Sequence, residues 1–136
     1  MDLFAGVGLF SVPLARAFQH VTAVERASPA ARDLRSNVPA NVKAVCADVA
    51  TFMRRKSPPL DYVVADPPRG GLGPGVCASL AAMAVPQIAY VSCDPATLAR
   101  DLKSLFASGY RISKLHLFDL FPQTFHIESL AELAHT

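Results

Sequence analysis

The chain has 136 residues, of which 51% are hydrophobic and 18% are charged, with a formal net charge of +2. This length and composition fit one domain whose core needs neither disulfides nor metal, and the mild charge permits a nucleic-acid partner without indicating one. Its three cysteines form no CxxC pair, which argues against a zinc site and favours the reducing cytoplasm. With no long apolar run and no leader, we expect neither a membrane span nor secretion.

Short apolar segments alternate with helix-like segments along the chain. Strands are predicted near residues 1–4, 21–25, 42–46, 62–65, 88–92, 112–118 and 129–135, and helices near 9–18, 29–37, 49–55, 75–84 and 95–107. This alternation predicts an α/β fold with a parallel sheet covered on both faces. Ligands bind beyond the carboxyl ends of such strands, so we expect the polar segments there to face one cleft.

The first predicted strand is short. Met1-Asp2-Leu3-Phe4 is typical of the end of an apolar strand rather than of a whole one. We therefore expect a truncated first strand and a piece of a longer protein, forming a single domain over residues 1–136.

A glycine turn joins this strand to the first predicted helix. Gly6 and Gly8 let the backbone approach a ligand closely, and a helix amino terminus follows them. Glu25 ends the next strand, 19 residues after Gly6, where a carboxylate can accept hydrogen bonds from both ribose hydroxyls. Asp48 ends the third strand, where an adenine amino group would lie. The alternative is purely structural, with Glu25 beside a helix cap and Asp48 as the N-cap of the following helix.

The details of this turn favour S-adenosylmethionine over NAD as the cofactor. Ser11 stands where the third glycine of a nicotinamide-binding turn is expected. The acidic Asp2 suits a cationic sulfonium or amino-acid tail better than a pyrophosphate. Asp66-Pro67-Pro68, at the end of the fourth predicted strand, favours the same cofactor.

Two prolines hold an acidic residue at that strand end. Pro67 and Pro68 fix two successive φ angles, and Pro67 keeps Asp66 extended. A carboxylate held in this way is preorganised for binding. The alternative is a structural turn in which Asp66 caps local amides.

Cys93 is a candidate nucleophile. It lies between Ser92, at a strand end, and Asp94-Pro95, which are typical of a helix N-cap and first helical residue. The partial positive charge of a helix amino terminus favours the thiolate, although Asp94 opposes it. A lone cysteine is more often a small buried hydrophobe. Cys46 and Cys77 fit that alternative because their surroundings are apolar.

Glu128 follows the last predicted loop, with His126 two residues before it. Alternation along an extended segment would point both side chains to one side. A carboxylate partly shielded by Phe121 and Phe125 could act as a general base, with His126 as an orienting or structural hydrogen-bond donor. The alternative is an exposed glutamate at the start of a strand.

Four segments carry a resemblance to a known family. They are Asp2-Leu3-Phe4-Ala5-Gly6-Val7-Gly8, Asp66-Pro67-Pro68-Arg69-Gly70-Gly71, Ser92-Cys93-Asp94-Pro95-Ala96-Thr97-Leu98-Ala99-Arg100-Asp101 and Asp119-Leu120-Phe121-Pro122-Gln123-Thr124-Phe125-His126-Ile127-Glu128. Through them the chain resembles the catalytic domain of the RNA (uracil-5-)methyltransferase family over nearly its whole length. The resemblance implies a class I S-adenosylmethionine-dependent methyltransferase (Rossmann-like) fold with a mostly parallel sheet and an antiparallel last strand.

The same resemblance implies a mechanism and a set of site residues. Cys93 would add to C6 of a uridine in rRNA or tRNA, C5 would take the methyl group, and Glu128 would remove the C5 proton. The implied cofactor-binding residues are Phe4, Gly6, Gly8, Glu25, Asp48 and Asp66, and the implied substrate-binding or supporting residues are Arg69, Thr124 and His126. It also implies a monomer that needs no metal in this chain.

The sequence departs from the family in two ways. Leu9 stands where members often have asparagine, which removes a polar contact to the cofactor. The family's upstream β-barrel RNA-binding domain and central domain lie outside this sequence. We therefore expect the choice of RNA and of uridine to reside mainly in those domains.

Two other functions stay open. A methyltransferase of nucleobase amino groups also uses a D/N-P-P loop, but with an aromatic residue where this chain has Arg69. A non-catalytic remnant would bind adenosine ligands or a partner without transferring methyl groups. Replacing Cys93 with alanine would spare an amino-group enzyme and abolish a C5 methyltransferase.

Overall fold

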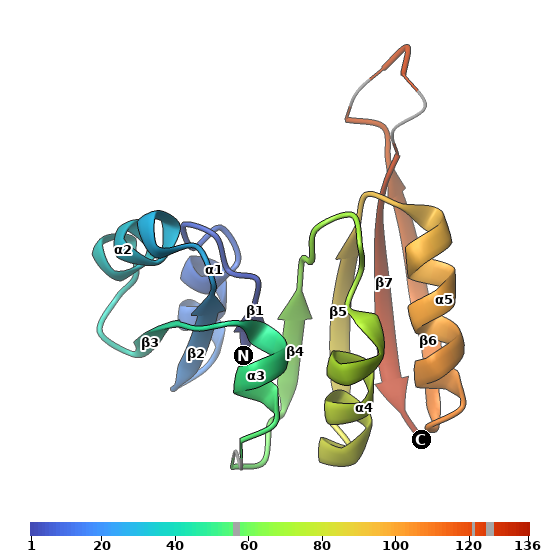
Figure 1. Ribbon diagram of the computed structural model, residues 1–136, viewed down its shortest axis with the longest axis horizontal. Coiled ribbons are helices and arrows are strands. Elements are labelled where there is room, and N and C mark those ends of the chain that lie inside the picture. The colour runs from blue at the N-terminus through green and yellow to red at the C-terminus, as the bar shows by residue number, and fades with distance from the viewer. Residues whose placement is uncertain (56–57, 121, 125–126) are drawn as a thin grey trace. The chain divides into compact units, whose positions relative to one another are not determined.

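The computed structural model describes residues 1–55, 58–120, 122–124 and 127–136 (Figure 1). The chain divides into two compact units, Met1–Lys56 and Ser57–Thr136. In each unit strands alternate with helices, as the apolar pattern predicts.

The first unit is a parallel sheet with a helix after each strand. Its strands, in spatial order β3-β2-β1, are β3 (Val42–Cys46), β2 (Val21–Glu25) and β1 (Asp2–Leu3), and its helices are α1 (Ser11–Ala17), α2 (Ser28–Asn37) and α3 (Val49–Met53). Leu3, Val24 and Leu34 are fully buried at its core. Burying each such side chain stabilises the fold by roughly 1.5–3 kcal/mol.

The second unit is a mixed sheet. Its strands, in spatial order β4-β5-β7-β6, are β4 (Tyr62–Ala65), β5 (Gln87–Ser92), β7 (Glu128–His135) and β6 (Tyr110–Phe118), and its helices are α4 (Gly73–Met83) and α5 (Pro95–Phe106). β4 and β5 are parallel, whereas β7 is antiparallel to both of its neighbours. Because of this direction, the start of β7 lies at the edge of the sheet where β5 ends.

Helix α5 shows how the local sequence sets an element. Asp94 is its N-cap, and the side chain accepts a hydrogen bond from the amide of Thr97, with Pro95 in the first turn. Leu98, Leu102 and Leu105 recur at helical spacing and are buried. The opposite face of the helix carries polar residues that lie in solvent.

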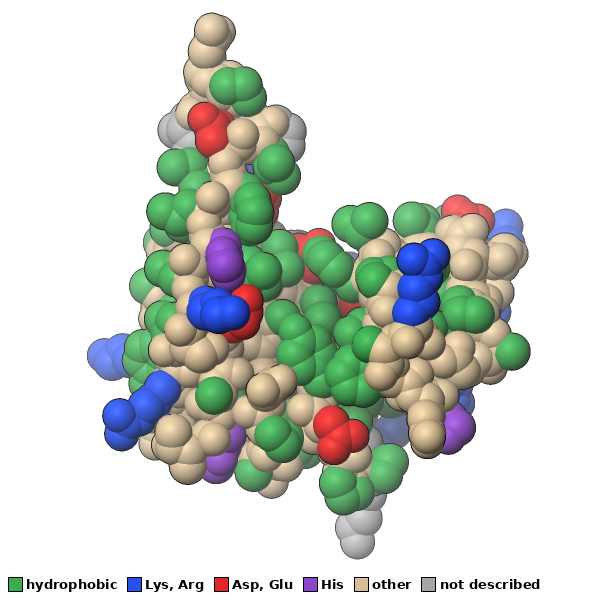
Figure 2. All heavy atoms as spheres, turned by 180° about the vertical axis from the view of Figure 1, so that it is seen from behind, with side chains coloured by type: hydrophobic (Ala, Val, Ile, Leu, Met, Phe, Trp, Pro, Cys, Tyr) green, Lys and Arg blue, Asp and Glu red, His purple; other side chains and the backbone are tan. Residues whose placement is uncertain are grey.

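Strand β6 is the edge of the second sheet, and all its residues after the buried Tyr110 are exposed, apolar ones included. Ile112, Leu115, Leu117 and Phe118 are all exposed, and Leu117 reaches 65%. Hydrophobic side chains line the part of the molecule formed by β6 and β7, seen from behind in Figure 2. The register of β6 against β7 shifts between Ile112 and Lys114, which marks a bulge or irregularity in the edge strand.

The predicted elements agree closely with the observed ones. The strands predicted at 21–25, 42–46 and 62–65 coincide with β2, β3 and β4. The first helix is shorter than predicted, because residues 6–10 form the glycine turn and α1 begins only at Ser11. Within the described residues no helix is long and apolar enough to span a membrane.

Candidate active site

The glycine turn of the first unit has an unusual backbone. Phe4, Gly6 and Gly8 all have positive φ angles, of 62°, 54° and 106°. A positive φ is rare for a bulky side chain, and such strain is concentrated at functional sites. A Cβ on Gly8 would lie 3.1 Å from Leu34 Cδ1 and 3.3 Å from Val38 Cγ1, so this glycine also lets the turn pack closely on α2.

Asp2 and Asn37 brace this turn, a role that sequence reasoning missed. The carboxylate of Asp2 is fully buried and accepts a short hydrogen bond from the Ser11 hydroxyl, which ties β1 to the start of α1. Asn37 Nδ2 donates to the carbonyl oxygen of Val7 at 2.9 Å. The sequence offered one signal for this hydrogen bond. A serine, able to donate, stands at position 11, where a third glycine would be expected, nine residues after Asp2.

Glu25 is bound to the glycine turn through its side chain. Its Oε2 accepts a hydrogen bond from the Gly6 amide at 2.9 Å, and its Oε1 accepts one from the Ala27 amide at 2.6 Å. The structure therefore joins two residues that were predicted to share the cofactor. A carboxylate has about four acceptor positions, so two remain for the hydroxyls of a ribose.

Asp48 is the N-cap of α3, as the structural alternative predicted. Its Oδ1 accepts a hydrogen bond from the Thr51 amide at 2.8 Å, and this bond lowers the pKa of Asp48 below its usual value. A cap uses one carboxylate oxygen and leaves the other for a ligand. Capping is thus compatible with cofactor binding.

The interpretation of Cys46 as a buried hydrophobe is wrong, whereas that of Cys77 is confirmed. Cys46 is exposed, and its Sγ lies 3.8 Å from the Arg26 carbonyl oxygen and 3.7 Å from Ser28 Oγ. It ends β3, the outer strand of its sheet, in which only Val42 is buried. Cys77 is buried, and desolvation raises its pKa to about 11, so its thiol stays protonated and unreactive.

In the second unit, Asp66 directly follows β4 in non-helical backbone, as the two prolines predict. The residue is exposed, yet the surrounding protein removes enough water from the carboxyl group to raise its pKa. The negative charge of Glu128 raises this pKa further. Asp66 and Glu128 are therefore electrostatically coupled.

Cys93 lies in a short turn between β5 and α5. Ser92 Oγ donates to the carbonyl oxygen of Asp94 at 3.0 Å and is 3.2 Å from the Asp94 amide, so one hydroxyl bridges the turn around the cysteine. The thiol is half-buried. The first turn of α5 follows at once, as the sequence predicts.

Strand pairing brings Cys93 and Glu128 together. Ser92 is paired with Ser129 in the antiparallel ladder of β5 and β7. Cys93 directly follows the end of β5, and Glu128 is the first residue of β7, directly before Ser129. The predicted nucleophile and base therefore lie at the same edge of the sheet.

The predicted substrate residues are placed less fully. The Arg69 side chain is exposed. The pKa of Asp94 is lowered mainly by the hydrogen bonds that it accepts from Thr97 and Ala96, and the positive charge of Arg69 lowers it further. Thr124 is exposed in the loop between β6 and β7. His126, together with Phe121 and Phe125, lies outside the described residues.

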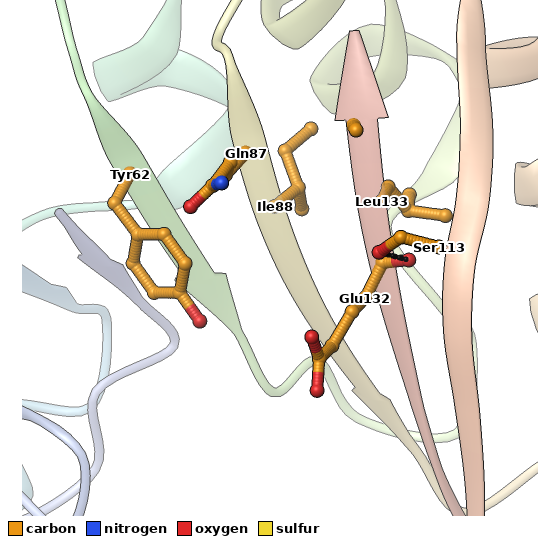
Figure 3. A pocket seen from close by; sticks show the side chains of 7 residues that line it. Tyr62, Gln87, Ile88, Ser113, Glu132 and Leu133 are labelled. Atoms are coloured by element: carbon orange, nitrogen blue, oxygen red, sulfur yellow. Dashed lines mark hydrogen bonds between the residues drawn. The ribbon is translucent and has the colours of Figure 1, made fainter.

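A pocket on the second sheet lies away from these residues (Figure 3). It is lined by Tyr62, Gln87, Ile88, Ser113, Glu132, Leu133 and Ala134. Tyr62 and Gln87 begin β4 and β5, so the pocket is at the opposite end of those strands from Asp66 and Cys93. The Ser113 hydroxyl donates to the Glu132 carbonyl oxygen at 3.0 Å, drawn as the dashed line.

Comparison with solved structures defines the fold class. A crystal structure of a Pyrococcus abyssi tRNA (uracil-54, C5)-methyltransferase in complex with S-adenosyl-L-homocysteine superposes with a TM-score of 0.83. The two sequences are 33% identical, and the match covers 98% of this chain and 33% of the other. The chain has the S-adenosylmethionine-dependent methyltransferase fold that was predicted.

Comparison with families places the chain more narrowly. Residues 1–135 match the family described as tRNA (Uracil-5-)-methyltransferase, and the chain belongs to that family. It is 40% identical over 137 residues to an uncharacterized RNA methyltransferase of Thermotoga maritima, covering 98% of this chain and 31% of the relative. It is 41% identical over 134 residues to the 23S rRNA (uracil(1939)-C(5))-methyltransferase RlmD of Chromohalobacter salexigens, covering 96% and 28%. The chain thus spans about a third of the length of these relatives.

Proposed function

We propose that this chain is the catalytic part of an enzyme that transfers a methyl group from S-adenosylmethionine to C5 of a uridine in rRNA or tRNA. The observation that carries the proposal is that Cys93, directly after the end of β5, and Glu128, at the start of the adjacent strand β7, lie at one sheet edge. Uracil C5 is a poor nucleophile, so its methylation needs both a group that adds to the ring and a base that removes a proton.

The proposal assigns cofactor binding to the residues that match the family's cofactor positions. They are Phe4, Gly6, Gly8, Glu25, Asp48 and Asp66. The chemistry of this set fits the cofactor, because Glu25 retains acceptor positions for a ribose diol. Bound there, S-adenosylmethionine would supply an electrophilic methyl group.

Cys93 would begin the reaction. Its thiolate forms a bond to C6 of uracil, and the electron pair displaced from the C5–C6 double bond makes C5 nucleophilic. The half-buried turn and the adjacent amino terminus of α5 suit this role, because a helix amino terminus favours a thiolate.

Glu128 would complete the reaction after C5 has gained the methyl group. Its carboxylate takes the C5 proton, the electron pair of that C–H bond re-forms the C5–C6 double bond, and the C6–sulfur bond breaks. Cys93 leaves as the thiolate, ready for another cycle, and Glu128 releases the proton to water.

The proposal takes its substrate contacts from the family resemblance. Arg69 would bind the RNA or the uracil, with Thr124 and His126 in support. A uridine inside a helix would have to turn out of the stack to reach Cys93. We place the reaction in the cytoplasm, on a monomer that needs no metal in this chain.

A trapping experiment tests the proposal. This chain is incubated with S-adenosylmethionine and RNA that contains 5-fluorouridine, using a tRNA and a 23S rRNA fragment, and its intact mass is measured. Fluorine at C5 cannot leave as a proton, so the reaction should stall as an RNA adduct that carries one added methyl group. Peptide mapping should place the RNA on Cys93.

Two variants sharpen the result. Cys93→Ala should abolish the adduct, whereas Cys46→Ala, which removes an exposed thiol of the first unit, should leave it intact. Transfer of methyl groups by Cys93→Ala would instead support an amino-group methyltransferase. The assay is repeated with this chain in place of the matching segment of the Thermotoga maritima relative, and absence of an adduct there too would overturn the proposal in favour of a non-catalytic binding role.

A further inference from the structure

One face of α5 holds the loop that follows Asp66. Thr97 Oγ1 donates to the Arg69 carbonyl oxygen at 3.0 Å, and Arg100 Nη2 donates to the Gly70 carbonyl oxygen at 2.7 Å. Asp101 Oδ2 accepts from the Leu72 amide at 2.7 Å. The helix residues are spaced i, i+3 and i+4, which places them on one face of the helix.

The acceptor at the centre of this contact is a buried carboxylate. The Asp101 side chain is 3% exposed, and Oδ2 also accepts a hydrogen bond from the Tyr90 hydroxyl at 2.8 Å. Arg100, 52% exposed, pairs with Oδ1 at 2.9 Å. A buried charge is costly unless it is paired and hydrogen-bonded, and Asp101 is both.

The loop comes so close to this carboxylate that position 71 accepts only glycine. Gly71 has a φ of +74°, and a Cβ there would overlap Asp101 Oδ2 and lie 3.1 Å from the Tyr90 hydroxyl. The loop is therefore fitted to the carboxylate.

Thr97 links the same loop to the turn that carries Cys93. Its hydroxyl lies 3.2 Å from the Asp94 carbonyl oxygen, and its amide donates to Asp94 Oδ1 at 2.9 Å. One side chain thus contacts the loop after Asp66 and the residue after Cys93.

We propose that Thr97, Arg100 and Asp101 act as a positioning clamp, which fixes the loop from Asp66 to Leu72 relative to Cys93. The residues contact backbone groups rather than the reacting atoms, so they act through Asp66, Arg69 and Cys93. This inference rests on the proposed function and adds to it the residues that set the geometry of the site.

The test uses a matched pair of variants at Thr97. Thr97→Val keeps the shape of the side chain and the amide bond to Asp94 but removes the hydroxyl, whereas Thr97→Ser keeps the hydroxyl. The rate of adduct formation with 5-fluorouridine RNA is measured at saturating cofactor and RNA, together with the melting temperature. We expect Thr97→Val to be about 10-fold slower, as for loss of one net hydrogen bond, and Thr97→Ser to restore the rate.

A second readout needs neither cofactor nor RNA. Alkylation of Cys93 by iodoacetamide is followed by mass spectrometry, with the exposed Cys46 as the internal standard. Loosening of the clamp in Thr97→Val should change the Cys93 rate several-fold relative to Cys46, and Thr97→Ser should not. Equal rates in all three proteins, in alkylation and in adduct formation, would overturn the clamp. If the unaltered chain forms no adduct, the proposed function fails, while alkylation still decides the clamp.

Discussion

Glu128, at the start of β7, is the base in the proposed reaction. Glu128→Gln keeps its shape but removes the ability to take a proton. We therefore expect the variant to form the bond between Cys93 and C6 with ordinary uridine and then to stall, so that methylated RNA accumulates covalently on the protein. Denaturing electrophoresis of labelled RNA measures this directly. Full turnover by Glu128→Gln would show that another group removes the proton.

Glu25 joins the glycine turn and retains acceptor positions for a ligand. Glu25→Gln replaces one of its oxygens by a donor, so we expect the affinity for S-adenosylmethionine to fall about 10-fold or more. Isothermal titration calorimetry measures the change. Asp33→Asn removes the same charge from an exposed position of α2 and should leave the affinity unaltered. An equal loss in both variants would indicate a general effect of charge.

The raised pKa of Asp66 determines the direction in which its ionisation changes the stability of the folded chain. The pKa of Asp66 is higher in the folded chain than in the unfolded chain, so its ionisation destabilises the folded chain. At a pH below the unfolded pKa the group is protonated in both states and does not affect the free energy of unfolding. Asp66→Asn should therefore increase the free energy of unfolding at pH 7, and the gain should shrink as the pH falls toward 4. Urea unfolding at both pH values tests this. A gain that does not depend on pH would point to a cause other than ionisation.

At the scale of elements, the difference in burial between two leucines predicts how much each contributes to stability. Leu105 is fully buried on α5, so Leu105→Ala should lower the free energy of unfolding by roughly 2–5 kcal/mol. Leu117, on the edge strand β6, is 65% exposed, so Leu117→Lys should change the free energy of unfolding by no more than about 0.5 kcal/mol. Denaturant unfolding compares the two. A large loss for Leu117→Lys would show that another part of the chain covers β6.

The elements were the most predictable part of the molecule. Buried strands such as β2 and β4 read as short apolar runs, so their bounds follow from the sequence. Asp94 and Pro95 likewise marked the start of α5. The pairing of Ser92 with Ser129, which brings Cys93 and Glu128 to one sheet edge, was less accessible, because strand register depends on contacts between segments far apart in the chain.

The supporting contacts of the site were the least predictable. Nothing in the sequence indicates that Asp101 would accept from the Leu72 amide and the Tyr90 hydroxyl, because these contacts join different elements of the fold and one of them involves a backbone atom. The prediction that Cys46 is buried was wrong for a related reason. An apolar segment predicts a buried strand, whereas β3 lies at the edge of its sheet and only Val42 is buried.

At the scale of the whole molecule, the modest charge limits RNA binding by this chain. With a net charge of +2, we expect it to neutralise few phosphates. For single-stranded RNA, about four phosphates correspond to a slope of roughly −3 in a plot of log affinity against log salt concentration. Fluorescence anisotropy at several KCl concentrations should give a slope no steeper than this. A much steeper slope would reveal a clustered basic face.

The irregular register of β6 bears on how this chain behaves when concentrated. An edge strand offers unpaired backbone groups to which a second copy can add, and repeated addition builds fibrils. The shift between Ile112 and Lys114 breaks the ladder in mid-strand, and the lysine places a charge at the break. Two copies would therefore find no long, continuous edge to share. Although β6 exposes several apolar side chains, its backbone is a poor template for amyloid growth.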